Sequence, residues 1–372
     1  MGARHGPVRV KACMAGPEGA NLLRHPCPPA FSGVRPLYAR SDVVVACFAS
    51  PWGGNTMPSR EEQIAGGIYG LLVGDALGVP YEFHAPARIP PPEDIDFQPP
   101  EGFQRAHDGV PPGTWSDDGA HALCLLDSLL YHGRLDPEDL GRRLVNWLEW
   151  GYLAVDGQVF DVGIQTRTAL ALVHAGTPAL MAGPKDERDN GNGSLMRVLP
   201  LALWHSGNDA KLASDAMTQS RVTHGHMRSQ VCCALYCLWA RRILQGARAS
   251  EAWTDAVETF RNLYPEGFEA RTELDTHVLP PGWEEIRGTG TGYVVDCLRS
   301  ARQCVVEHDT YEQGVKAAVR LGRDTDTTAA VAGGIAGLIH GVNGIPARWR
   351  ESLRGGELLH PMLQKLLKCT VS

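Results

Sequence analysis

Residues 322–340 read GRDTDTTAAVAGGIAGLIH and join a short acidic turn to a long apolar run. In the run, apolar side chains recur at spacings of three and four, the period of an α-helix buried on one side. Asp324, Asp326 and Thr327 stand together where this helix would begin. A helix start is served by one capping side chain, so two carboxylates and a hydroxyl exceed that need. The stretch predicts a buried helix that opens on an acidic cluster.

The same helical pattern recurs along the chain after its first 56 residues. Ser59 and Glu62 have the spacing of a capping box at the start of the first such segment. Few runs alternate with the period of a strand, so we predict an all-α fold, a single compact multi-helix domain over residues 57–372. The expected helical segments are 64–72, 120–131, 137–150, 164–174, 214–244, 294–307, 311–321 and 327–340.

Three segments lack this pattern. Residues 1–56 mix Arg, Gly, Pro and Cys without a sustained period, and we expect them to be a disordered extension. The apolar run 43–49 lies too far along the chain for a signal peptide. Residues 86–113 hold eight prolines, and residues 268–292 are rich in Gly, Pro and Thr. Irregular stretches of this length inside a domain are often functional, so we expect the last two to serve the site.

Composition excludes several classes of protein. The chain has 372 residues, 43% of them hydrophobic and 21% charged, which excludes a disordered, collagen-like or coiled-coil protein. The formal net charge of −7 gives no electrostatic basis for a nucleic-acid surface. The longest apolar runs, such as 329–339, fall short of the roughly 18 residues that span a bilayer, so we expect no membrane segment.

The cysteines indicate a reducing compartment. Ten are present and no pair has C-x-x-C spacing. Cys232, Cys233 and Cys237 fall together in an apolar stretch without a histidine partner, which favours buried thiols on a core helix over a zinc site. We therefore expect a cytoplasmic protein.

A second acidic cluster resembles the first in composition. Ser116, Asp117 and Asp118 directly precede an apolar segment, and alone they are typical of a helix N-terminus. With the cluster at Asp324 they give four carboxylates and two hydroxyls. Such a set would be costly in one pocket without cations, and oxygen ligands favour Mg²⁺ or Mn²⁺ over zinc. Sequence spacing does not decide whether the two clusters meet.

Two further carboxylates lie early in the chain. Asp75 stands in the stretch Gly74–Gly78, and Glu82 follows one short turn later. One interpretation is a polar helix end before Pro80. The other makes Glu82 a general base, or a carboxylate that orients water, near the cations.

Two loops could bind a ligand. Residues 190–197 read NGNGSLMR, and glycines there would let backbone N–H groups approach an anion at a helix start, although Asn-Gly also marks ordinary turns. The loop lacks the Walker pattern and a strand before it. His224 and His226 precede a long helix from Met227, and their spacing of two weakens a zinc site. Ligand binding and a simple surface position stay open for this pair.

The order of these motifs resembles the ADP-ribosylglycohydrolase family over residues 59–353, approximately. Five motifs in sequence carry the resemblance, which makes it far more specific than any one of them: GLLVGDALG at 70–78, SDD at 116–118, GNGSLMR at 191–197, TH at 223–224 and GRDTDT at 322–327. The resemblance implies an all-α fold with a two-cation Mg²⁺ or Mn²⁺ centre in a cleft. It implies as metal ligands Ser116, Asp117, Asp118, Asp324, Asp326 and Thr327.

The resemblance also implies roles around the cations. Glu82 matches the acidic residue after the family's first helix, and Asp161 matches an acidic residue of the arginine-specific members, near the substrate guanidinium. Glu82, Asp118 and Asp161 are therefore the expected catalytic residues. The expected diphosphate loop is Gly191, Asn192, Gly193, Ser194 and Met196, with His224 contacting the ligand and Tyr293 beside the adenosine half. One departure is Gly119, where the family usually has Thr, which questions the geometry next to the first cluster.

The function implied is metal-dependent hydrolysis of the glycosidic bond between ADP-ribose and a modified side chain, arginine above others. The partner would be an ADP-ribosylated protein or conjugate, and we expect a monomer. One alternative keeps the same centre but hydrolyses free ADP-ribose conjugates or nucleoside-like glycosides. Another is a protein that binds ADP-ribose without catalysis, which loss of metal ligands would indicate. Here both clusters are intact apart from Ser116, which keeps the hydroxyl of the family's Thr.

Overall fold

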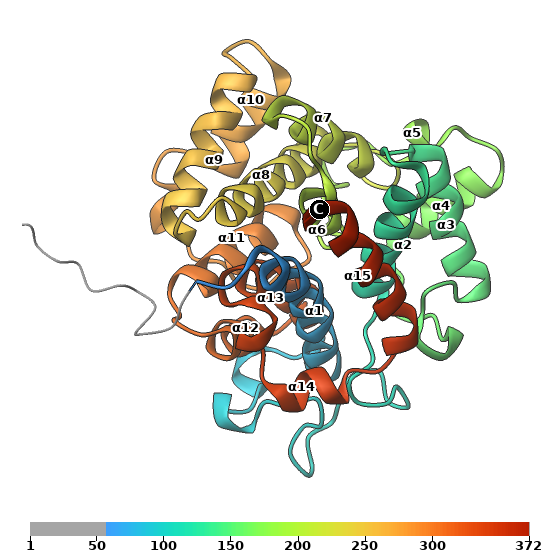
Figure 1. The fold of residues 1–372 in the computed structure, drawn as a ribbon, viewed down its shortest axis with the longest axis vertical. Helices are drawn as coiled ribbons and strands as arrows, with labels where there is room; N and C mark the ends of the chain where they lie inside the picture. The colour runs from blue at the N-terminus through green and yellow to red at the C-terminus, as the bar shows by residue number, and fades with distance from the viewer. Residues whose placement is uncertain (1–56, 372) are drawn as a thin grey trace, which may run out of the picture. The chain divides into compact units, whose positions relative to one another are not determined.

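The computed structural model describes residues 57–371, and in this range the secondary structure is helical without a β-strand (Figure 1). The prediction of an all-α fold is confirmed; the extension expected over 1–56 lies outside the described residues. The helices are α1 Arg60–Gly78, α2 Asp117–His132, α3 Pro137–Trp150, α4 Ile164–His174, α5 Ala179–Ala182, α6 Leu199–Trp204, α7 Asp209–Ser220, α8 Met227–Leu244, α9 Ala249–Leu263, α10 Glu269–Glu273, α11 Val294–Val306, α12 Tyr311–Arg320, α13 Thr325–Gly344, α14 Ala347–Ser352 and α15 Gly356–Val371.

Glycines let α1 and α13 pack with their backbones in direct contact. Gly66, Gly70 and Gly74 recur every fourth residue, so they share one face of α1. A Cβ on Gly70 would lie 2.2 Å from the carbonyl oxygen of Gly333, and one on Gly337 would lie 2.0 Å from that of Gly66. No side chain fits between the two helices at these points, so the spacing of glycines sets their separation.

This antiparallel pair places the end of α1 against the start of α13. The Thr325 hydroxyl donates to the carbonyl oxygen of Gly78 at 2.8 Å. A Cβ on Gly78 would lie 2.3 Å from the Cα of Asp326. Asp324 and Asp326 therefore begin α13 within reach of Glu82, which follows α1 after a single 3-10 turn. The packing of two core helices thus brings together carboxylates about 240 residues apart in sequence.

The helix pair gives a stability prediction. Gly70→Ala forces a methyl group against a backbone carbonyl that cannot rotate away, so we expect the free energy of unfolding to fall by about 3 kcal/mol. Gly141→Ala on α3 is the matched control, because its Cβ would meet only side-chain methyl groups, the nearest at 3.2 Å. The control should stay within about 1 kcal/mol of the parent protein, since alanine also gains helix propensity. Equal stability of the two variants in denaturant unfolding would contradict the proposed packing.

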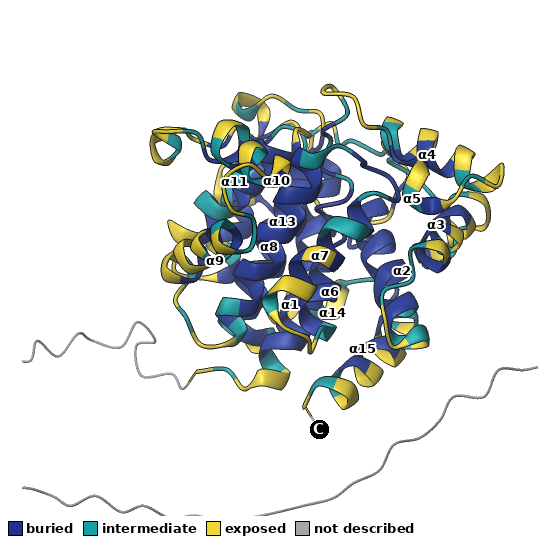
Figure 2. Cartoon of the chain, turned by 90° about the horizontal axis from the view of Figure 1, so that it is seen from above, coloured by how far each residue is buried: buried dark blue, intermediate teal, exposed yellow. Residues whose placement is uncertain are grey.

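The core extends from this pair to α8 (Figure 2, where α8 and α13 are mainly dark blue). Residues 229–240 of α8 are buried throughout. Cys232, Cys233 and Cys237 are fully buried free thiols, which confirms their expected place on a core helix. Among residues 57–371, the groups of side chains that could hold a metal include no cysteine.

One helix corrects the expectation about membranes. The segment Arg60–Tyr81 is long and apolar enough to cross a bilayer by length and composition, although no run of this length was expected. Its apolar window is 94% buried inside the protein, as in a core helix.

The structure corrects three local predictions. The helix expected over 214–244 is two helices, α7 and α8, separated by the turn that carries His224. Residues 268–292 contain helical structure: α10, a π-helical turn at Leu274–Val278 and a 3-10 turn at Trp283–Glu285. Outside residues 268–292, the helices that were not expected are α5, α6, α9, α14 and α15.

Candidate functional site

The two acidic clusters meet in one buried site. The Thr327 hydroxyl donates to Asp118 Oδ1 at 3.3 Å, which joins the start of α13 to the start of α2. Asp75, Asp118 and Asp326 each offer an oxygen within 4.8 Å of the others, and so do Glu82, Asp324 and Asp326. Asp326 belongs to both groups. The two acidic clusters, which sequence spacing alone did not place together, are therefore neighbours in space.

Asp75 secures the start of α2. Its carboxylate accepts the N–H of Ser116 at 2.9 Å and that of Gly119 at 2.8 Å, and the Ser116 hydroxyl in turn accepts from the N–H of Asp118. The capping interpretation of Ser116 is thus confirmed. Asp75 does lie in the last turn of α1, but its side chain is fully buried and caps a second helix, α2.

The glycine at position 119 fits a tight space. A Cβ there would lie 2.7 Å from Cγ of Trp115 and 2.7 Å from Cδ2 of Leu72. Trp115 is itself buried at the helix start, so the threonine usual in the family would require the indole to move. The Gly119 N–H donates to Asp75 Oδ2 at 2.8 Å, so the tight packing holds this backbone against Asp75.

Asp324 has no capping role. The structure shows no capping hydrogen bond from its side chain; instead its Oδ2 accepts from Asn192 Nδ2 at 2.7 Å. Asp326 Oδ1 accepts from the N–H of Thr327 at 2.9 Å. The Asp324 contact links the acidic site to the glycine-rich loop.

The donor set fits divalent cations that bind oxygen ligands. Asp118 Oδ2 and Asp326 Oδ2 are buried and, within residues 57–371, have no hydrogen-bond partner. Burial, reinforced by the neighbouring carboxylates, raises the pKa of Asp117, Asp118 and Asp326 well above the usual range. Unpaired buried carboxylate oxygens are costly unless a cation neutralises them. The carboxylates that the structure groups closely enough to hold a cation are Asp75, Asp118 and Asp326, and Glu82, Asp324 and Asp326; of the six expected ligands, Ser116, Asp117 and Thr327 are in neither group.

These shifts predict how metal stabilisation depends on pH. Burial raises the pKa of Asp75 to about 7 and that of Asp161 to about 6. A carboxyl whose pKa is higher in the folded state stabilises the protein most at low pH, and that contribution is lost as pH rises through the folded pKa. The metal-free protein should therefore lose stability between about pH 4 and pH 7. Mg²⁺ replaces the lost protons, so the gain in Tm on adding it should increase over the same range. Thermal unfolding scans with Mg²⁺ and with chelator, at about pH 4 and at about pH 7, measure this gain in Tm. An equal gain at the two pH values would contradict the prediction.

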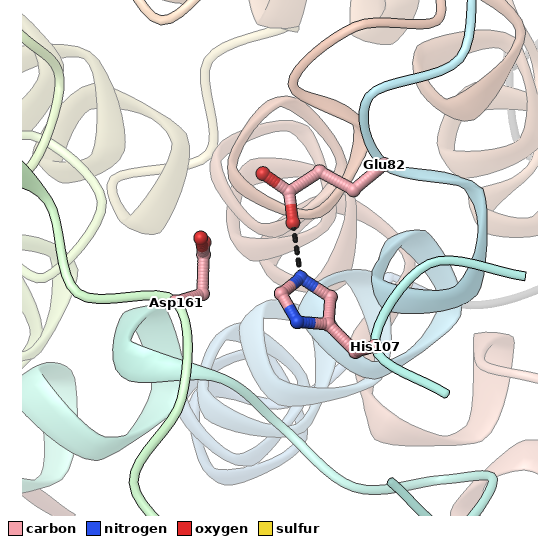
Figure 3. Close-up of side chains that lie close together, drawn as sticks. All are labelled: Glu82, His107 and Asp161. Atoms are coloured by element: carbon pink, nitrogen blue, oxygen red, sulfur yellow. Dashed lines mark hydrogen bonds and ion pairs between the residues drawn. The ribbon is translucent and has the colours of Figure 1, made fainter. Parts of the chain in front are cut away.

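Glu82 lies beside the acidic site and is held by a histidine (Figure 3). Its Oε2 lies 2.6 Å from Nε2 of His107, a residue of the proline-rich stretch. Asp161 points from a facing loop toward the same space, with its carboxylate within 4.8 Å of both groups. Burial raises the pKa of Glu82 to about 10, and the charge of Asp161 is the next cause. His107 was missed, because a histidine in an aperiodic loop gives no signal in sequence.

A pocket of about 540 Å³ runs from these carboxylates to the glycine-rich loop. Among the expected site residues its walls include Glu82, Asp117, Asp161, Gly191, Asn192, Gly193, Met196, His224, Tyr293, Asp324 and Thr327. Ser116, Asp118, Asp326 and Ser194 lie behind the walls. The Ser194 hydroxyl faces the core, where it bonds to that of Ser220 at 2.8 Å, so its side chain cannot reach a ligand in the pocket.

The glycine-rich loop has fewer free donors than its sequence suggests. The N–H of Gly191 donates to Gln165 Oε1 at 2.9 Å, and the N–H of Asn192 donates to the carbonyl oxygen of Gly292 at 3.1 Å. In the described chain the N–H groups of Gly193 and Ser194 are left without a partner. The expected helix start is absent, because residues 193–197 form turns and α6 begins only at Leu199.

Two residues behind the loop were not expected. The Arg197 guanidinium, fully buried, donates to the carbonyl oxygen of Gly193 and to the hydroxyl of Thr223. Gln165 fixes the other end of the loop. Arg197 was visible in the NGNGSLMR stretch, but a buried arginine without a carboxylate partner is not predicted by composition or period. His226 caps α8, whereas His224 lines the pocket.

The fold and the site define a helical protein with an acidic, cation-compatible pocket beside a loop suited to an anion. The family model for ADP-ribosylglycohydrolase matches residues 56–371, and the chain belongs to that family.

Known relatives agree with this assignment. The chain is 30% identical over 306 residues to ADP-ribosylarginine hydrolase Tri1 of Pseudomonas putida, covering 82% of this chain and 78% of that protein. It is 30% identical over 299 residues to the ADP-ribosyl-dinitrogen reductase glycohydrolase of Rhodospirillum rubrum, covering 80% and 92%. A solved structure described as an ADP-ribosylglycohydrolase-related protein complex superposes with a TM-score of 0.68 at 32% identity, covering 84% of this chain and 99% of that one.

Proposed function

We propose that this protein is a hydrolase that removes ADP-ribose from a modified arginine side chain with the help of Mg²⁺ or Mn²⁺. One observation carries the proposal: a single pocket joins the two carboxylate clusters to the glycine-rich loop, so that a ribose-linked bond and a diphosphate could be held at once. The 30% identity to ADP-ribosylarginine hydrolase Tri1 supports arginine as the linkage.

Glu82 is the general base in this proposal. It lines the pocket, whereas Asp118 lies behind the wall with Oδ1 already bonded to Thr327. Glu82 would take a proton from the water whose oxygen bonds to the anomeric carbon as the C–N bond breaks; the bonding pair stays on nitrogen, and the departing guanidine takes up a proton and leaves as guanidinium. Bound cations would supply positive charge that lowers the pKa of the surrounding carboxylates and stabilises charge in the transition state. The contact with His107 would hold Glu82 toward the pocket.

Asp161 would bind the leaving guanidinium. Asp161 lines the pocket, its carboxylate lies within 4.8 Å of that of Glu82, and the residue adopts a positive φ of 52°. A carboxylate and a guanidinium form a strong charge-assisted pair. In this proposal the arginine side chain lies on the Asp161 side of the pocket, close to Glu82.

The opposite end of the pocket would bind the nucleotide part. Tyr293 lies beside Gly191 in an isolated antiparallel bridge and is 39% exposed. Arg228 donates to its hydroxyl at 3.2 Å and is itself paired with Glu273. The tyrosine ring is thus fixed at the pocket wall, where it could stack on a base.

We also propose a partner, a compartment and an oligomeric state for the protein. Its partner would be an ADP-ribosylated protein or a smaller ADP-ribose conjugate. We place it in the cytoplasm, because the seven cysteines of the described residues are free thiols, and we propose a monomer.

Parallel hydrolysis of arginine-linked, serine-linked and nucleotide-linked ADP-ribose, each with Mg²⁺ and with Mn²⁺, tests the proposal. We expect release from arginine, with the other linkages far slower. Release from serine alone would overturn the arginine assignment, and release from nucleotide conjugates alone would favour the free conjugate as substrate. Binding of ADP-ribose without any hydrolysis would show a non-catalytic protein.

A further inference from the structure

Arg197 forms an unusual buried centre behind the glycine-rich loop. The side chain is fully buried, and all its hydrogen bonds go to neutral oxygens. Nε donates to Gln219 Oε1 at 2.9 Å, and Nη2 donates to the carbonyl oxygen of Gln219 at 3.0 Å. Within residues 57–371 the ion pairs of the structure do not include Arg197. Burying a cation is costly when no anion lies beside it, even if its hydrogen bonds are satisfied.

Nη1 of Arg197, which also donates to the carbonyl oxygen of Gly193 at 3.1 Å, reaches His224 through a hydroxyl. Arg197 Nη1 donates to Thr223 Oγ1 at 2.7 Å, and Thr223 Oγ1 lies 2.8 Å from Nδ1 of His224. A guanidinium can only donate, so it occupies a lone pair of the hydroxyl and leaves the hydroxyl hydrogen to find another acceptor. In the described chain the structure gives that hydrogen one other partner, Nδ1. The Thr223 hydroxyl therefore donates to Nδ1, which has to be unprotonated.

The other ring nitrogen then carries the hydrogen, and it faces the loop. A Cβ on Gly193 would lie 2.8 Å from Cε1 and 3.3 Å from Nε2 of His224. One on Gly191 would lie 3.4 Å from Nε2. His224 also lines the pocket, and within residues 57–371 no hydrogen bond from Nε2 is present. The Nε2–H edge of the His224 ring therefore faces the glycine-rich loop. Two backbone N–H groups of this loop, those of Gly191 and Asn192, already have partners within the protein.

We propose that Arg197 and Thr223 are positioning residues that fix His224 in the neutral form with hydrogen on Nε2, so that this N–H joins the loop in binding the diphosphate of the ligand. The nearby guanidinium adds a positive charge behind the loop without contacting the ligand. The part of this proposal that concerns the ligand rests on the proposed function. The form of the ring does not, because it follows from contacts within the protein.

The form of the ring can be measured directly. In full-length Mg²⁺-loaded protein with ¹⁵N-labelled histidine, long-range proton–nitrogen spectra distinguish protonated from unprotonated ring nitrogens, and a His224→Gln variant identifies the signal. We expect Nε2 protonated and Nδ1 unprotonated before any ligand is added. A hydrogen on Nδ1 would overturn the proposal, whatever the protein hydrolyses.

Binding tests the role of the relay. Thr223→Val keeps the shape but removes the hydroxyl, and we expect its Kd for ADP-ribose, measured by calorimetry, to rise about 10-fold. Thr223→Ser restores the hydroxyl and should bind within about threefold of the parent. Thr259→Val is the matched control, because Thr259 accepts from Arg242 in a similar contact on α9, away from the pocket.

An unchanged Kd in Thr223→Val would overturn the role in binding, as would equal losses in the valine and serine variants. If the parent protein binds ADP-ribose weakly and hydrolyses no conjugate, the proposed function fails. The spectrum of His224 would then still decide whether Arg197 and Thr223 fix the ring.

Discussion

Asp326→Asn is expected to lower the rate of hydrolysis of arginine-linked ADP-ribose by at least about 1,000-fold. Asp326 is the carboxylate shared by the two groups of oxygens, one with Asp75 and Asp118 and the other with Glu82 and Asp324. It is fully buried, and one of its oxygens has no hydrogen-bond partner in the described residues. Removing its charge should weaken both cation positions at once.

The same variant should also lose its stabilisation by Mg²⁺. An amide of the same shape no longer needs a cation, so the Tm should rise little when the metal is added, and the helical fold should be retained. Asp94→Asn is the matched control, since Asp94 is exposed in the proline-rich stretch, and it should behave as the parent. An Asp326→Asn protein with parental turnover would show that the cations, if any, bind elsewhere.

Glu82→Gln should have the second largest effect, a fall of about 1,000-fold in kcat with little change in KM. The amide keeps the size of the side chain and its contact with His107, but it cannot accept the proton of the attacking water. Glu82 is 4% exposed and lines the pocket, so bulk water cannot readily replace it as a base.

A variant of His107, which contacts Glu82, provides the comparison for Glu82→Gln. His107→Gln leaves the carboxylate in place and removes only the group that holds it at 2.6 Å, so we expect a loss of about 10-fold. If Glu82→Gln retained kcat within a few-fold while Asp118→Asn lost it, Asp118 would be the base. The order of the three variants therefore assigns the proton transfer.

The sequence predicted the residues of the site better than their arrangement. The residue types of the two clusters, each at a helix start, led to the prediction of an oxygen-ligand cation site, and the structure brings carboxylates of both clusters together in groups that could hold a cation. Their contact through Thr327 and Asp118 depends on how α1, α2 and α13 cross, which no local pattern gives. A signal did exist: glycines every fourth residue, at 66, 70, 74 and 78, indicate a helix face that packs directly on another backbone.

Side-chain networks were the least predictable part. His107 reaches Glu82 from a segment without regular period, and Arg197 is buried although arginines are usually exposed. The roles of Gly191 and Asn192 as backbone donors to a ligand were predicted from residue type, but tertiary contacts with Gln165 and Gly292 already use both N–H groups. Such contacts depend on residues distant in sequence, and single-chain patterns do not contain them.

The helix boundaries show which local signals are strong. The start of α1 was predicted by the capping box of Ser59 and Glu62, which the structure confirms with both hydrogen bonds. The helix expected over 214–244 is interrupted between Ser220 and Met227, and His224 in this turn lines the pocket. The periodic pattern of the sequence did not indicate this break.

Cation dependence is tested most directly by following ADP-ribose release from an arginine-linked peptide by the full-length protein before chelation, after exhaustive chelation, and after Mg²⁺ is restored. We expect release in the first and third conditions and a loss of at least about 1,000-fold in the second. Undiminished release after chelation would contradict the acidic pocket as a cation-dependent centre. Failure to release ADP-ribose from arginine in any condition would contradict the proposed function itself.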